Sequence, residues 1–146
     1  MYEKLTCGGN ECNNYLYLSF NAKYFDTEKI TEELNVAPTS VMIKKEPVPK
    51  STAWKFQIDA GSEIDLEKYL HELINIFEPK VEIINRLKNE YDLTTRIQFV
   101  MDIDVNPESS TPYFRLNKKA IDFLAKTGTE VDFDLYKADT IGISQK

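Results

Sequence analysis

The sequence predicts an α+β domain, a single two-layer α/β sandwich with about four or five mixed strands and its helices on one face. Two patterns carry this prediction. Short segments alternate apolar and polar residues, as half-buried strands do, and a longer segment repeats apolar residues every three or four positions, as amphipathic helices do. The 146 residues suit one domain. We expect a mobile N-terminal segment at 1–14, the domain at 15–138 and a C-terminal tail at 139–146.

The first predicted elements are a strand at 15–22, rich in aromatic and apolar residues, and a helix directly after it. Asp26 or Thr27 can cap the start of this helix, and Pro38 prevents its continuation. The chain from Pro38 to Lys50 then forms a basic, proline-containing surface excursion.

The segment "AWKFQIDA" predicts the next strand, at 53–60. Trp54, Phe56 and Ile58 fall on one face of this strand, and polar residues fall on the other. Because side chains alternate across a strand, this pattern directs the indole of Trp54 into the core.

A long apolar stripe predicts a helical segment from about Ser62 to Tyr91, and Pro79 inside it predicts a kink or two consecutive helices. A strand at 94–105, a helix between Asn117 and Gly128, and a strand at 130–136 complete the domain. The order strand–helix–strand occurs on both sides of the long helical segment. Two β-α-β units joined by a long kinked helix are therefore one architecture, with parallel strands in each unit.

Composition bears on the possible functions. A net charge of −6 argues against a nucleic-acid partner, because neutralising phosphates requires a basic face. His71 is the one histidine, so the sequence contains no recognisable catalytic set, and its position beside the apolar stripe favours a structural or surface role. Cys7 and Cys12 lack the spacing of a redox motif or a zinc site. We expect no enzyme activity, no cofactor and no bound metal.

No apolar run approaches the length of a membrane span, so we expect a cytoplasmic protein without a membrane partner.

Four aspartates form the first candidate site. Asp102 and Asp104, in "MDIDV", and Asp132 and Asp134, in "VDFDL", each place two carboxylates on one face of a strand. If the two strands were neighbours, four like charges would crowd one sheet face. Three interpretations stay open: the solvent face of a half-covered sheet, an acidic surface for a basic protein, or a divalent-cation site.

The surface excursion is the second candidate. Lys44 and Lys45 make it locally basic in an acidic protein, and they could contact a partner. Trp54 and Tyr24 could form a stacking platform for a ligand. The competing interpretation is that Trp54 belongs to the core, as the alternation of its strand indicates.

Three segments resemble a bacterial family, domain of unknown function 4279. "ITEELNVAPTS" is similar to the family's "IT..LG..PT" pattern, with Asn35 where glycine is usual. The strand with Trp54 follows a basic, proline-containing loop and precedes a helix with "EPK", and "LNKKAIDFLAKTGTEVDFDLY" resembles the family's helix–Gly–"DIDLY" end. The resemblance spans most of 15–137. It implies no established activity, and it suggests a role in bacterial toxin–immunity neighbourhoods.

We therefore expect a non-enzymatic binding domain, such as an immunity-type protein that binds a basic partner, for example a toxin, through an acidic sheet face. The alternative is a small-molecule or divalent-metal-binding domain with a pocket under the 38–54 loop. A self-associating structural module is a third hypothesis, and we expect a monomer or a weak homodimer.

Overall fold

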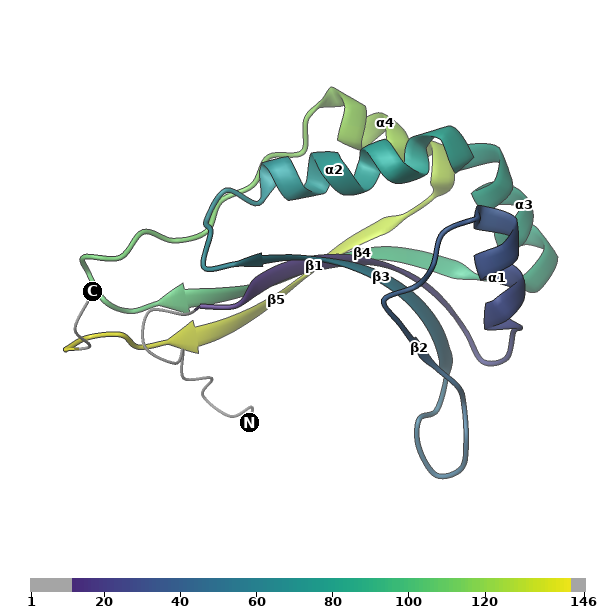
Figure 1. Cartoon of the computed structure of the whole chain (residues 1–146), viewed down its shortest axis with the longest axis horizontal. Coiled ribbons are helices and arrows are strands. Elements are labelled where there is room, and N and C mark those ends of the chain that lie inside the picture. The colour runs from purple at the N-terminus through teal and green to yellow at the C-terminus, as the bar shows by residue number, and fades with distance from the viewer. Residues whose placement is uncertain (1–11, 143–146) are drawn as a thin grey trace.

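The structure, a computed structural model, describes residues 12–142 and contains a five-stranded sheet in the order β2-β3-β1-β4-β5 (Figure 1). The strands are β1 (Asn14–Ala22), β2 (Ser40–Met42), β3 (Thr52–Gly61), β4 (Thr94–Asp104) and β5 (Glu130–Ala138). The central strand β1 is antiparallel to both of its neighbours, β3 and β4. β5 runs parallel to β4, so the sheet is mixed, as predicted.

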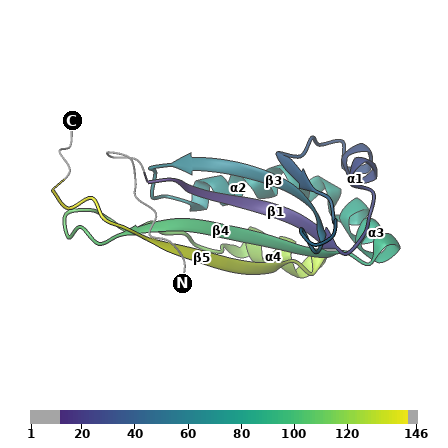
Figure 2. The ribbon, with the colours of Figure 1, turned by 90° about the horizontal axis from the view of Figure 1, so that it is seen from below.

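The helices lie on one side of this sheet (Figure 1). They are α1 (Thr27–Leu34), α2 (Glu67–Phe77), α3 (Val81–Tyr91) and α4 (Lys118–Thr127). Figure 2 views the sheet from below: α2 and α4 lie behind the strands, α1 and α3 lie at one end of the sheet, and this lower face carries no described helix. The predicted two-layer α+β sandwich is confirmed. Within 12–142, no helix has the length and apolar character needed to cross a membrane.

The helix ends follow the signals in the sequence. The Asp26 carboxylate accepts hydrogen bonds from the backbone N–H groups of Glu28 and Lys29, at 3.0 and 3.3 Å. Asn35 ends α1 in the left-handed conformation, with φ 54°, which asparagine adopts more readily than most residues. Asn117 caps α4 through the Ala120 N–H, and Gly128 ends it at φ 60°.

Pro79 divides the long helical segment as predicted. A single 3₁₀ turn, Glu78–Lys80, separates α2 from α3. Proline suits the first turn of a helix, where its missing N–H has no helical partner, and it disfavours unbroken α-helix through this point. The break lets α2 and α3 lie at different positions over the sheet (Figure 1).

Trp54 lies at the centre of the core with no exposed surface. Its ring centroid lies 5.4 Å from that of Phe20 on β1 and 6.4 Å from that of Phe77 on α2. Its Nε1–H donates a 2.9 Å hydrogen bond to Thr31 Oγ1 on α1. The indole therefore joins two strands to two helices, which confirms the buried position that the alternation predicted.

The topology of the first half differs from the prediction. A first β-α-β unit would make the strands at 15–22 and 53–60 parallel, but β1 and β3 are antiparallel neighbours. The reason is β2, a three-residue strand that pairs with β3 and that the sequence analysis treated as part of the loop. Since β2 is antiparallel to β3, it runs parallel to β1, so α1 connects β1 to β2 and a hairpin then reverses the chain. The second unit, β4-α4-β5, has parallel strands as predicted.

Replacing Trp54 with alanine should lower the free energy of unfolding by about 3–5 kcal/mol, because it leaves a large cavity and removes the hydrogen bond that Thr31 Oγ1 accepts from the indole. Urea denaturation followed by circular dichroism measures this loss. Tyr24→Ala is the control, since Tyr24 is 67% exposed, and it should change stability by less than about 0.5 kcal/mol. Equal losses in the two variants would contradict the assignment of Trp54 to the core.

Candidate functional site

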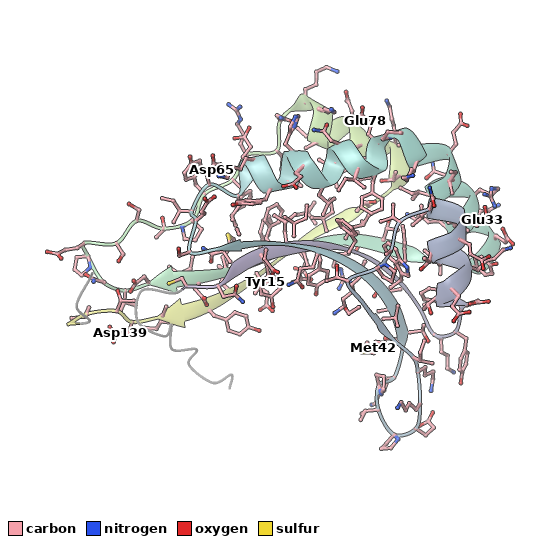
Figure 3. All side chains as sticks on the ribbon, in the orientation of Figure 1. Tyr15, Glu33, Met42, Asp65, Glu78 and Asp139 are labelled. Atoms are coloured by element: carbon pink, nitrogen blue, oxygen red, sulfur yellow. The ribbon has the colours of Figure 1, made fainter. Side chains whose placement is uncertain are left out.

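The sheet face opposite the helices, here called the open face, carries three rows of side chains. Residues directly opposite one another on paired strands point to the same face, so the strand register defines these rows. From β3 through β1 and β4 to β5 they are Asp59, Tyr15, Val100 and Asp134; Gln57, Tyr17, Gln98 and Asp132; and Lys55, Ser19, Arg96 and Glu130. Figure 3 shows Tyr15 on the side of the sheet away from the helices.

Tyrosines and carboxylates gather in one half of the open face. The rings of Tyr15 and Tyr17 are stacked, with centroids 6.4 Å apart and an interplanar angle of 22°. Tyr136, on β5, donates a 3.0 Å hydrogen bond from its hydroxyl to Asp134 Oδ2. We call the group formed by Tyr15, Tyr17, Tyr136, Asp59, Asp132 and Asp134 the tyrosine–carboxylate cluster.

The pKa values of the tyrosines reflect the negative field of this cluster. Burial raises the pKa of Tyr15, and the carboxylates of Asp134, Asp102 and Asp59 raise it further. For Tyr136, the hydrogen bond to Asp134 is the largest cause of a raised pKa. The raised pKa values favour the neutral form of all three phenols.

The open face is electrostatically divided. Burial and the neighbouring Tyr15 raise the pKa of Tyr17, while Arg96 lowers it, so Arg96 lies close to the cluster. The Lys55 Nζ atom lies 4.7 Å from the centroid of the Tyr17 ring. Lys55 and Arg96 both belong to the third row, and the carboxylates of Asp59, Asp132 and Asp134 belong to the first two. The acidic, aromatic half suits a cationic group, because ammonium and guanidinium ions bind both carboxylates and aromatic faces.

The four candidate aspartates separate into two pairs with different surroundings. β4 and β5 are neighbours, but their register places Asp102 opposite Tyr136 and Asp134 opposite Val100, so no carboxylate lies directly opposite another in these pairs. Asp132 is exposed and Asp134 is partly exposed on the open face. This pair therefore remains accessible to a partner.

Asp102 and Asp104 instead hold the ends of strands together. Asp102 is 6% exposed, its Oδ2 accepts a 2.8 Å hydrogen bond from the Asn13 N–H, and its own N–H donates to Asn14 Oδ1 at 2.8 Å. Asp104 accepts hydrogen bonds from the N–H and hydroxyl of Thr140, at 3.1 and 2.5 Å, and from the Asn106 N–H at 3.0 Å. These contacts give the pair a structural role.

A polar pocket of about 190 Å³ adjoins this second pair. Its lining includes Cys12, Asn14, Asp102, Asp104 and Thr140. Several of its polar atoms are engaged with one another: the Asp102 N–H donates to Asn14 Oδ1, and the Thr140 hydroxyl donates to Asp104 Oδ2. We therefore assign the pocket to the junction of β1, β4 and the end of β5.

The residues of the 38–54 loop do not come together as one site. Trp54 is enclosed in the core and presents no ring face to a ligand. Tyr24 is exposed, and the Lys44 Nζ lies 5.4 Å from its ring centroid while forming a 2.7 Å ion pair with Glu46. Lys45 is exposed, and its side chain has no assigned role. A pocket of about 520 Å³ borders Tyr24, and it contacts this loop at Ser51 rather than lying beneath it.

Other chemistry-bearing residues form no centre in the described part of the chain. Across 12–142, no three His, Cys, Asp or Glu side chains lie where they could hold a metal ion together. His71 is exposed on α2. Cys7 lies outside the described residues.

The tyrosines of the cluster were not predicted as site residues. In "YLYLSF", Leu16, Leu18 and Phe20 are fully buried, so the strand alternation alone places Tyr15 and Tyr17 on the opposite face. The signal was present locally, but the partners of those tyrosines depend on strand order.

The Asp104 contacts predict a loss of stability in acid. Burial acts to raise the pKa of Asp104, but hydrogen bonds from Thr140, Asn106 and Ser109 together outweigh it and lower the pKa from 3.8 to about 2. Because the folded-state pKa lies below the unfolded value, ionised Asp104 stabilises the fold above about pH 4, and this stabilisation is lost as the pH falls through about 2. Solvent screening limits the contribution to about 1 kcal/mol.

Asp104→Asn should therefore be less stable than the wild type at pH 6, and the difference should shrink toward pH 2. Urea denaturation at each pH measures both values. Thr140→Val removes one hydrogen-bond donor, so NMR titration should show a higher Asp104 pKa in that variant. A stability difference that stays constant between pH 6 and pH 2 would contradict the role assigned to Asp104.

Comparison with known proteins gives one result. No match was found among curated proteins or among solved structures. The sequence profile of a family described as a domain of unknown function (DUF4279) matches residues 10–138, which includes every strand and helix of the described structure. The resemblance seen in the sequence is confirmed, and the chain belongs to the DUF4279 family.

Proposed function

We propose that this protein is a non-enzymatic binding domain that holds a basic protein partner on its open face. The observation that supports this proposal is the tyrosine–carboxylate cluster on a sheet face without a described helix. Aromatic residues that combine an apolar ring with a hydrogen-bonding group are enriched at protein interfaces. The cluster therefore combines contact area with negative charge.

The chemistry of the cluster selects cationic side chains. A lysine or arginine of the partner can lie over a tyrosine ring while it pairs with Asp132 or Asp134. The contact between the Lys55 Nζ atom and the Tyr17 ring is an example, within the protein itself, of the cation–ring part of this geometry. An exposed ion pair contributes about 0.2–1 kcal/mol and a cation–π contact about 0.5–1 kcal/mol, whereas micromolar affinity requires about 8 kcal/mol. The partner must therefore engage several rows of the open face at once.

The narrower form of the proposal is an immunity-type protein in the bacterial cytoplasm. Such a protein would cover the basic active surface of a nuclease toxin, whose own substrate is a polyanion. The net charge of −6 and the exposed Asp132 and Asp134 support this form, because charge complementarity speeds association and disfavours acidic competitors.

Co-expression with a basic protein encoded by an adjacent gene, followed by pull-down and calorimetry, tests the proposal. Asp132→Asn combined with Asp134→Asn should weaken binding about three- to thirtyfold, because two ion pairs are lost. The matched control is Glu72→Gln combined with Glu82→Gln, which removes two exposed charges from the helix layer. The control should bind nearly as well as the wild type. Equal weakening in both double variants would indicate a general charge effect and contradict a specific site on the open face.

The alternative, a domain that binds a small molecule or a divalent metal, has a separate test. Thermal unfolding in millimolar Mg²⁺ or Ca²⁺, and across a metabolite library, would show a raised Tm if such a ligand bound the folded state. We expect no stabilisation by either cation, because the Asp102 and Asp104 carboxylates already accept hydrogen bonds from the protein. A rise corresponding to about 2 kcal/mol or more would favour the alternative.

A further inference from the structure

Among the described residues, β5 is an outer strand of the sheet, and its outer edge, which pairs with no other described strand, lies beside the tyrosine–carboxylate cluster. It has nine residues, whereas β2, at the other edge, has three. An outer strand presents backbone N–H and C=O groups that are not paired with another strand, and it can accept an added strand. β5 is long enough for a stable addition, because strands of about five or six residues are common in sheets.

The backbone pattern identifies the groups that face outward. The Ala138 carbonyl accepts a 2.9 Å hydrogen bond from the Val105 N–H, so the peptide groups of Ala138 point toward β4. Peptide groups alternate in direction along a strand, and both groups of one residue point the same way in a parallel ladder. The outward residues are therefore Val131, Phe133, Leu135 and Lys137. The Phe133 N–H accordingly pairs with the Asp132 carboxylate, at 3.0 Å, rather than with β4.

The side chains along this edge alternate between two chemistries. Phe133 and Leu135 lie on the helix side and are 43% and 50% exposed. Phe133 stacks on Phe114, with centroids 4.9 Å apart, so the apolar layer continues to the edge of the sheet. Asp132 and Asp134 lie on the open face. An added strand would thus meet apolar side chains on one face and carboxylates on the other.

We propose that the β5 edge accepts an extended segment of the basic partner as a sixth strand, with basic and apolar residues alternating along it. This inference rests on the proposed function and specifies how the partner binds. Basic residues of the added strand would face Asp132 and Asp134, and its apolar residues would cover Phe133 and Leu135. Backbone hydrogen bonds would supply affinity, and the alternation would supply specificity.

A second copy of this chain is disfavoured at the same edge when the two β5 strands pair around Phe133. In an antiparallel pair of β5 strands centred on Phe133, Asp132 of one copy would lie opposite Asp134 of the other. Like charges directly opposite one another destabilise a strand pair, and both chains carry a net charge of −6. A partner with lysine or arginine at those positions converts the same repulsion into attraction.

Leu135→Pro tests the backbone contribution. The proline removes the outward N–H of residue 135 and leaves the N–H groups that bond to β4, and proline is tolerated in edge strands. Leu135→Thr is the control, because it removes a similar apolar side chain but keeps the N–H. Circular dichroism and thermal unfolding verify that both variants remain folded.

The probes are two capped peptides of one composition, one alternating lysine and valine and the other with its lysines and valines in separate blocks. Calorimetry should show that the wild type prefers the alternating peptide. Leu135→Pro should weaken binding of the alternating peptide about tenfold or more, and Leu135→Thr should weaken it less than about threefold. Methylation of the backbone nitrogens of the alternating peptide, at the residues whose N–H groups would face β5, should weaken binding to the wild type as much as Leu135→Pro does. Sedimentation should show that the unbound wild type remains monomeric.

The outcomes separate the two proposals. One outcome is that the alternating peptide binds the wild type, that its affinity falls with Asp132→Asn and Asp134→Asn, and that its affinities for Leu135→Pro and Leu135→Thr are equal. This outcome overturns strand addition, and the open-face proposal stands. If neither peptide binds the wild type at millimolar concentration, both proposals fail. If Leu135→Pro is unfolded, equal affinities of the wild type for the N-methylated and unmodified peptides overturn strand addition. If the wild type forms a dimer and Leu135→Pro is monomeric, the occupant of the β5 edge is a second copy of this chain, and the proposal of a basic partner is overturned.

Discussion

The pairing of β1 on both sides is the constraint on which the rest of the structure depends. β1 is bonded to β3 and to β4 along most of its length, so its register sets the face of every side chain in the middle of the sheet. Leu16, Leu18 and Phe20 are fully buried beneath the helices, and each contributes about 1.5–3 kcal/mol by burial. A slip of one residue would expose all three and place Tyr15 and Tyr17 in the core. The position of the tyrosines is therefore a consequence of core packing.

Coverage of the sheet by helices on one side then determines the character of the other side. The three rows of the open face are mostly polar, as suits a face that no second apolar layer covers within residues 12–142. Their charges are separated by register: Arg96 lies between Ser19 and Glu130, while Asp134 lies beside Val100. The carboxylate repulsion expected from neighbouring acidic strands is reduced in this way. It is reduced further because Asp102 and Asp104 are held by backbone donors at the strand ends.

Most of the elements could be predicted because their signals are local. Alternation in "AWKFQIDA", the Asp26 and Asn117 caps and the break at Pro79 each depend on a few adjacent residues. β2 gave no such signal, since all three of its residues are exposed and no apolar alternation marks it. Its omission was enough to make the predicted direction of β3 wrong, because the hairpin that follows β2 reverses the chain.

The candidate site was less predictable because its distinctions are long-range. "DID" and "DFD" look equivalent in the sequence. Asp104 differs from Asp132 because Thr140, 36 positions later, contacts it, and Asp102 is bound by Asn13, 89 positions earlier. No local pattern reports such contacts. The tyrosines could have been assigned to the open face from alternation alone, but their proximity to Asp59 and Asp134 requires the order of four strands.

The two edges of the sheet are protected in different ways, and the difference bears on function. β2 is short and leads into a loop that contains Pro47 and Pro49, which offers little length for pairing. β5 is three times as long. Among the described residues its main protection is carboxylates, and the Asp132 carboxylate accepts a hydrogen bond from the Phe133 N–H. Proline removes a backbone donor whatever the charge of the added strand, whereas a carboxylate repels an acidic strand and attracts a basic one. Protection by charge therefore disfavours an acidic strand at this edge more than a basic one, which is the selectivity that the proposed strand addition requires.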